Sequence, residues 1–134
     1  MKKLLTVLAV CLLPGCAAVD AVLMTKFDPN EYLQITEIRA ASEQYAAQCD
    51  DPVASKRNAN DMATRTRLFE LYSADLPHNG DSVKAATALN DIAQGLAKKY
   101  NDDEKVSALF CKLKFQGLQN SSDVIRHVLA NRPR

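Results

Sequence analysis

The sequence has few of the residues from which catalytic sites are usually built. Its 134 residues include no tryptophan, two histidines and four glycines, and aromatic residues make up 6% of the chain. No glycine-rich phosphate loop, nucleophile elbow, HExxH zinc motif or CxxCH haem motif is present. We therefore expect that the protein is not an enzyme.

The residues that bind metals or cofactors are scattered along the chain. His78 falls in a turn at residues 77–80, and both it and His127 are expected at the surface. A haem between Met62 and His127 is one alternative, but Met62 falls in a predicted apolar stripe, where methionine ordinarily fills a core. The acids at residues 102–104 are expected to stabilise the first turn of a helix rather than to bind a metal ion. The sequence predicts no metal site and no non-covalent cofactor.

No charge of one sign dominates. The chain has 17 Lys and Arg against 16 Asp and Glu, a balance that argues against nucleic-acid binding. The charges are nevertheless unevenly placed, since residues 28–51 are mostly acidic and residues 112–134 mostly basic. These segments are expected to attract one another or to lie solvated on separate faces. The alternative is that the basic C-terminus contacts anionic lipid or an acidic partner.

The chain also lacks a hydrophobic run long enough to stay in a membrane. The apolar run at residues 4–13 spans about 15 Å as a helix, roughly half the thickness of the hydrocarbon layer. Lys2 and Lys3 precede it, and Pro14 and Gly15 follow it. This order of basic, apolar and small residues predicts an export signal that is removed.

The end of this signal resembles the lipobox of bacterial lipoproteins, which has an aliphatic residue three positions before a cysteine and a small residue directly before it. Leu13, Gly15 and Cys16 match that pattern, and Pro14 stands where a small residue is usual. The resemblance covers about 16 residues and implies cleavage after Gly15, with lipid attached to Cys16. Since Ala17, rather than aspartate, follows the cysteine, it also implies an outer-membrane protein that faces the periplasm.

The rest of the chain is expected to form one domain. Residues 1–15 are the predicted signal peptide, residues 16–27 a lipidated N-terminus and tether, and residues 28–134 a helical domain. The tether contains no glycine, proline or serine, so it is expected to be ordered. Apolar residues make up 47% of the chain, enough for a core.

Helical periodicity and capping residues predict an all-α bundle of four main helices and a short C-terminal helix. Asp28 with Glu31 forms a capping box, and Asp51 opens the second helix. The main helices are expected at residues 28–49, 51–76, 82–100 and 101–120. The short one follows Ser121 or Ser122 and holds Val124, Ile125, Val128 and Leu129. We expect four helices packed in a bundle with short loops.

The fourth predicted helix has two apolar arcs. One contains Val106, Leu109, Phe110 and Leu113, and the other contains Ala108, Cys111, Phe115 and Leu118. Two arcs indicate either a central helix or a helix with one arc left for a partner. The candidate binding residues on these arcs are Val106, Phe110, Leu113 and Phe115.

The two cysteines that remain free after cleavage and lipidation are predicted to form a disulfide. Cys49 and Cys111 each lie on an apolar arc, and export places them in an oxidising compartment. The alternative is two buried thiols that act as small hydrophobic residues.

The sequence therefore predicts a non-enzymatic envelope lipoprotein that is anchored by lipid and binds a protein partner. A phage-encoded or mobile-element lipoprotein acting in lysis or receptor shielding is one alternative. A helical ligand carrier is another, and it would need an apolar pocket between two helices.

Overall fold

The structure is a computed structural model that describes residues 25–134. The predicted signal peptide, Cys16 and most of the predicted tether lie outside the described residues. The described part contains helices and no strand: α2 (Pro29–Ala46), α3 (Pro52–Asp75), α4 (Gly80–Asn101) and α5 (Ala108–Ala130). The all-α prediction is confirmed for this part of the chain.

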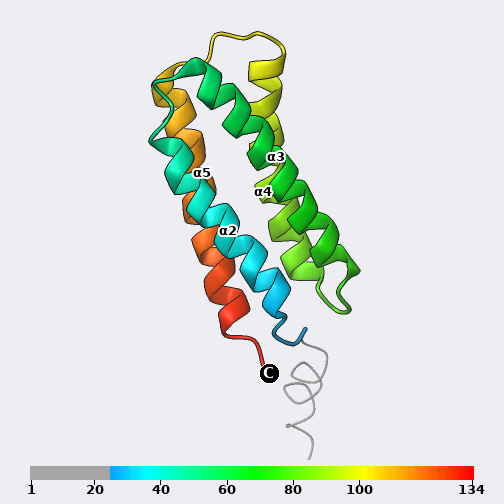
Figure 1. Cartoon of the computed structure of the whole chain (residues 1–134). Helices are drawn as coiled ribbons and strands as arrows, with labels where there is room; N and C mark the ends of the chain where they lie inside the picture. The colour runs from blue at the N-terminus through cyan, green and yellow to red at the C-terminus, as the bar shows by residue number, and fades with distance from the viewer. Residues whose placement is uncertain (1–24) are drawn as a thin grey trace, which may run out of the picture.

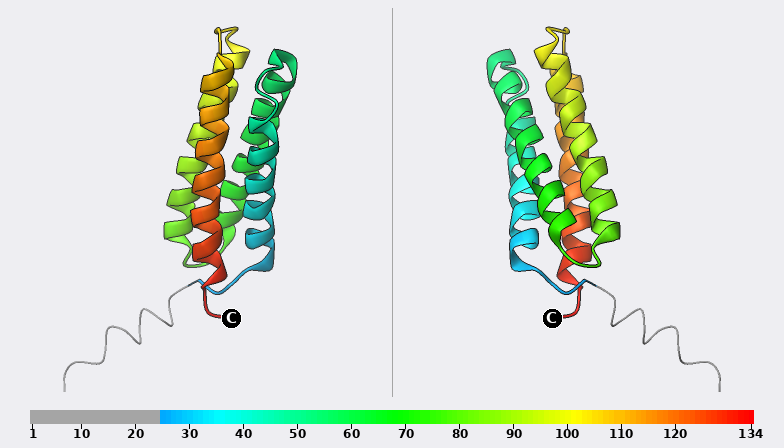
Figure 2. Two further views of the ribbon diagram at one scale, coloured as in Figure 1. Left: turned by 90° about the vertical axis from the view of Figure 1, so that its left-hand side faces the viewer. Right: turned by 90° about the vertical axis from the view of Figure 1, so that its right-hand side faces the viewer.

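Successive helices run in opposite directions along one bundle (Figure 1). α2 packs mainly on α5 and α3 packs mainly on α4, while smaller contacts join α2 to α3 and α4 to α5. The C-terminus lies at the same end of the bundle as the start of α2 (Figure 2). We call this the terminal end, and we call the opposite end, where the α2–α3 and α4–α5 connections lie, the disulfide end.

The N-termini of the first two helices form as the sequence predicts. The carboxylate of Asp28 accepts hydrogen bonds from the backbone N–H groups of Asn30 and Glu31, at 2.9 and 2.8 Å. Asp51 accepts from Val53 and Ala54 at 2.9 and 3.1 Å. Each aspartate satisfies donors that the helix leaves free, and a proline follows it at the first helical position.

The core contains large side chains from all four helices. The fully buried ones include Ile35 and Ile38 of α2, Met62 and Phe69 of α3, Leu89 and Leu96 of α4, and Phe115, Leu118 and Leu129 of α5. The buried residues of α3 and α4 recur mainly at spacings of three and four, as expected for helices with one inward face.

The start of the last helix differs from the prediction. The acids at residues 102–104 do not open a helix but follow the end of α4, where Lys98 pairs with Asp102 at 3.4 Å and Lys99 with Glu104 at 2.7 Å. α5 begins at Ala108, and the Ser107 hydroxyl caps it by accepting from the N–H of Phe110 at 3.1 Å. The C-terminus of α4 favours cations, and its last turn contains Lys98 and Lys99. These two lysines attract the acids to the end of α4.

The predicted short C-terminal helix is also wrong as a separate element. α5 continues without a break through Gly117 and Ser122 to Ala130. The Ser122 hydroxyl does not cap a new helix but donates to the carbonyl of Leu118 at 2.7 Å, and Ser122 is fully buried. Burial of Leu118, Ser122 and Leu129 offsets the weak helix propensity of residues 117–122, since tertiary packing supplies most helical stability in proteins.

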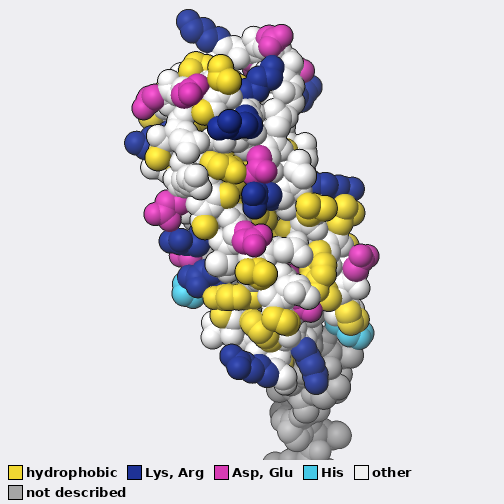
Figure 3. Space-filling view, in the orientation of Figure 1, with side chains coloured by type: hydrophobic (Ala, Val, Ile, Leu, Met, Phe, Trp, Pro, Cys, Tyr) yellow, Lys and Arg dark blue, Asp and Glu magenta, His cyan; other side chains and the backbone are white. Residues whose placement is uncertain are grey.

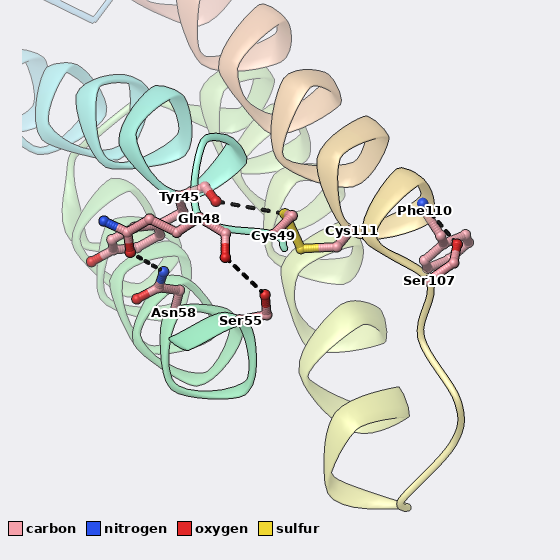
Figure 4. Close-up of a disulfide and its surroundings, with 8 residues drawn as sticks. All are labelled: Tyr45, Gln48, Cys49, Ser55, Asn58, Ser107, Phe110 and Cys111. Atoms are coloured by element: carbon pink, nitrogen blue, oxygen red, sulfur yellow. Dashed lines mark hydrogen bonds between the residues drawn. A yellow bond between two sulfur atoms is a disulfide. The ribbon is translucent and has the colours of Figure 1, made fainter. Parts of the chain in front are cut away.

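The predicted disulfide is present and links the segment after α2 to α5 at the disulfide end. Cys49, just after α2, is bonded to Cys111 in the first turn of α5, with Cα atoms 5.8 Å apart and a sequence separation of 62 (Figure 4). Beside it, the Asn58 amide donates to Gln48 at 2.7 Å and the Ser55 hydroxyl donates to the Gln48 carbonyl at 3.3 Å. The bridge and these bonds together tie the α2–α3 connection to α5.

Candidate functional site

The candidate catalytic and cofactor residues do not meet in a site. His78 and His127 are both exposed, and Met62 is fully buried among core side chains. Met62 and His127 therefore do not face a common pocket that could hold a haem. In residues 25–134, no group of three or more histidine, cysteine or acidic residues is placed to hold a metal ion.

The most distinctive surface of the domain is the outward side of α5. It exposes four large apolar side chains to solvent: Leu109 (66%), Leu113 (57%), Val124 (65%) and Val128 (60%). At 100° per residue these four share one side of the helix with Gly117 and Asn120, which lie between them. We call these six residues the α5 surface.

The opposite side of α5 belongs to the core. It buries Cys111, Phe115, Leu118, Ser122, Ile125 and Leu129. Phe115 is fully buried and packs on Tyr45 edge to face, with ring centroids 5.6 Å apart. Phe115 is therefore a core residue, and we correct the prediction that counted it among the binding residues.

The remaining predicted residues lie at or near the α5 surface. Leu113 is one of its members, whereas Val106 and Phe110 are half-buried against the core. The ammonium groups of Lys99 and Lys114 lie 5.9 and 5.4 Å from the ring centre of Phe110. Phe110 thus forms a partly covered edge of the surface, flanked by cations.

Sequence reasoning missed Val124 and Val128 because it broke the helix at residues 117–120 and placed both residues in a separate short helix. Once α5 is continuous, the helical phase carries through, and both valines join Leu109 and Leu113 on one side. The available signal was the spacing of Leu113 and Val124, which are 11 residues apart. Eleven residues complete about three turns, so these two residues share a face.

Gly117 has no role in packing within the described domain. A Cβ atom built at this position would meet no other atom within 4 Å. A glycine in a helix interior costs about 1 kcal/mol relative to alanine, and the surroundings of Gly117 give no compensating contact. Gly80 and Gly95 have the same open space, so the space at Gly117 permits a close approach to α5 without by itself indicating one.

Charged side chains border the α5 surface and are partly paired. Asp123 accepts hydrogen bonds from Arg126 at 2.9 Å and from Arg39 of α2 at 3.1 Å. The hydrogen bonds from Arg126, together with the charges of both arginines, lower the pKa of Asp123 against an opposing effect of desolvation. Arg126 also donates to the Tyr32 hydroxyl at 3.2 Å, so hydrogen bonds join this border to α2.

A second candidate is an open groove between α2 and α3. Ile38, Leu68 and Leu71 are its main apolar residues, and most of its other lining is polar or charged. Figure 3, which views the side of α2 and α3, shows apolar patches separated by charged groups. The carboxylate of Asp61 accepts from Tyr45 at 2.6 Å and from Arg65 at 2.5 Å. Burial opposes ionisation of Asp61, but these two bonds lower its pKa, so the polar wall of the groove is already satisfied.

A buried polar cluster occupies the terminal end. Glu31 is fully buried and pairs with Arg132 at 2.6 Å, while its other oxygen accepts from Ser73 at 2.9 Å and from Asn79 at 2.8 Å. Arg132 also donates to Asn79 at 2.7 Å and to Ser82. Every member has a partner, so the cluster joins helices and offers no free group to a ligand.

This cluster corrects the predicted capping box. Asp28 caps α2, but the Glu31 side chain turns into the core toward Arg132 rather than back to the N-cap N–H. The pair also connects the acidic and basic segments, as one of the sequence interpretations expects. Nearby, the N–H of Phe27 donates to the carbonyl of Pro133 at 2.8 Å, and the Arg134 guanidinium lies 5.6 Å from the centre of the Phe27 ring.

Comparison with known protein families, with curated proteins and with solved structures finds no match. Across residues 25–134, no helix combines the length and the hydrophobicity that a membrane span requires.

Proposed function

We propose that the protein is a non-enzymatic lipoprotein of the bacterial envelope that binds a protein partner through the α5 surface. The observation that carries this proposal is the alignment of four exposed apolar side chains on one side of α5: Leu109, Leu113, Val124 and Val128. Monomeric domains tolerate single exposed apolar residues, but aligned ones mark contact sites. The lipobox-like segment at residues 13–16 supports an anchored protein that acts at a membrane.

The α5 surface suits a protein better than a small molecule. It is the convex side of a helix, whereas ligand sites are concave and enclose most of their ligand. The α2–α3 groove is open, and its polar groups are already bonded to one another. A helix side with aligned apolar anchors is instead the geometry by which helices bind other helices or apolar grooves.

The proposal is tested by placing a charge in the middle of the surface. We expect Leu113→Glu to leave the free energy of unfolding within about 0.5 kcal/mol of wild type, since this side chain is largely exposed. We also expect it to abolish the protein's crosslinked complexes in intact cells, because a buried carboxylate without a partner opposes binding. Thermal unfolding and crosslinking followed by immunoblotting measure the two effects.

Leu68→Glu on α3 is the matched control, since Leu68 is 58% exposed and Leu113 is 57% exposed. Complexes that survive Leu113→Glu and disappear with Leu68→Glu would assign binding to the α2–α3 groove and contradict the proposal. Complexes that survive both substitutions would remove both surfaces as candidates.

A further inference from the structure

We propose that the partner on the α5 surface is a second copy of this chain, packed antiparallel about a two-fold axis that passes midway between Gly117 and Asn120. This inference rests on the proposed function and names its occupant. Three independent features of α5 support it: the symmetry of the surface, its two central residues and the charges at its border.

The six positions of the α5 surface are symmetric about one point of the helix. Residues 109, 113 and 117 precede the midpoint by the same distances at which residues 128, 124 and 120 follow it. An antiparallel copy therefore brings Leu109 level with Val128, Leu113 level with Val124, and Gly117 level with Asn120. A two-fold interface requires such self-complementarity, because both copies contribute the same surface and every contact between two positions occurs twice.

The directions of the side chains agree with this pairing. At 100° per residue, the two members of each pair lie at equal angles on opposite sides of the centre line of the surface. Side chains so placed lie side by side in one layer when two helices pack antiparallel. The 11-residue spacing between the two halves of the surface is close to the helix's own period, so two such helices stay in contact over about five turns with little supercoiling.

The centre of the surface has the residues that a helix crossing needs. Gly117 has open space where a side chain would stand, which allows the mate's Asn120 side chain to approach the backbone. A polar asparagine at the centre of the seam disfavours shifted registers, since a shift places its amide against leucine or valine. The two central residues therefore favour the one register in which Gly117 and Asn120 lie level.

The border charges are complementary under the same operation. Lys112 and Asp123 lie on the same side of the surface. The two-fold axis places Lys112 of one copy two residue positions, about 3 Å along the helix, from Asp123 of the other copy. Arg39 and Arg126 both donate to Oδ1 of Asp123. Lys112 of the second copy thus approaches a carboxylate that is fixed in position but whose charge the two arginines already offset, so the contact favours this register more than it strengthens the dimer.

The outer side of α5 is free to receive this copy within the described domain. α5 forms one corner of the bundle, and no other described helix covers its outward side (Figure 2). A stable dimer usually buries about 800 Å² per partner, which is more than one row of four large side chains supplies. We expect a weak dimer that forms chiefly where lipid anchors hold copies at high local concentration.

Cysteine crosslinking in membranes tests the dimer and its register. Full-length Leu113→Cys and Val124→Cys chains, each with a different tag, are expressed separately or together. We expect a disulfide-linked dimer that carries both tags in the co-expressing cells. In an antiparallel dimer, position 113 of one copy and position 113 of the other are separated by about 16 Å along the axis, beyond the roughly 7 Å between Cα atoms that a disulfide spans. Neither variant expressed alone should therefore form the dimer.

Leu68→Cys co-expressed with Val53→Cys reports random collision, since both exposed residues lie on α3, and should give no dimer above background. Dimers from either α5 variant alone would indicate a parallel or variable arrangement and overturn the proposed register. If no co-expressed dimer forms while a complex with a different protein is still lost with Leu113→Glu, the second copy is wrong and the proposed function stands. If that complex is absent too, both proposals fail.

Discussion

Removal of the Cys49–Cys111 bridge is expected to lower the free energy of unfolding by about 4 kcal/mol. The bridge joins residues with a sequence separation of 62, and loss of such a crosslink gives the unfolded chain more conformations than it otherwise has. The Cys49→Ala/Cys111→Ala variant should therefore unfold on the order of 15 °C below wild type. Urea and thermal unfolding, followed by circular dichroism, measure the difference.

Reduction provides the control for this experiment. Wild-type protein unfolded in the presence of dithiothreitol should match the double-alanine variant, which should not respond to the reductant. A reduced wild type as stable as the oxidised protein would contradict the predicted role of the bridge. A large difference between reduced wild type and the double variant would indicate that packing of the two buried sulfur atoms contributes separately.

Separation of the buried Glu31–Arg132 pair is expected to have a similarly large effect. Glu31→Gln leaves Arg132 without its charged partner in a site where its side chain is only 9% exposed. Breaking one side of a buried ion pair costs about 3–5 kcal/mol, because the other charge stays buried and unpaired. Arg132→Gln should lower the free energy of unfolding by a comparable amount, and urea unfolding measures both losses.

The double variant and a neighbouring arginine separate this effect from simple loss of packing. Glu31→Gln/Arg132→Gln should be clearly more stable than the sum of the two single losses predicts, since no unpaired charge remains. Arg134→Gln should cost less than about 1 kcal/mol, because Arg134 is exposed and its guanidinium lies over the Phe27 ring. Additive losses in the double variant would show that the pair is not coupled.

The disulfide and the Glu31–Arg132 pair together explain how a single helix can present a rigid surface. The disulfide joins α5 to the α2 side at one end of the bundle, and Arg132 joins the segment after α5 to α2 and the α3–α4 turn at the other. Between them, Arg39 and Arg126 hold the Asp123 border in place. A surface fixed in this way loses little conformational entropy on binding, which favours association.

Much of the fold was predictable from local signals. Asp28 and Asp51, each followed by proline, mark helix starts because capping depends on neighbouring residues alone. The disulfide was predictable because only two cysteines follow Cys16. In contrast, the position of Glu31 fits the capping-box pattern, but its side chain bonds to Arg132, 101 positions away. No local pattern indicates which of these two competing partners a side chain chooses.

The candidate surface was only partly predictable for a related reason. Gly117 and Asn120 are weak helix formers, and local propensity placed a break between Leu113 and Val124. The break does not occur because Leu118 and Ser122 are buried by neighbouring helices, a gain that propensity scales do not contain. Continuity of α5 then unites two half-surfaces that local propensity assigns to different helices.

Everything proposed for the function depends on export and lipid attachment at Cys16. Intact-mass spectrometry of the protein isolated from membranes under non-reducing conditions tests this most directly. We expect a chain that begins at Cys16, carries covalent acyl groups there and is two hydrogens lighter than the dithiol form because Cys49 and Cys111 are joined. A Cys16→Ser variant should lack the acyl mass and leave the membrane fraction. A wild-type chain that retains Met1 or carries no lipid would show that the protein is not a lipid-anchored lipoprotein.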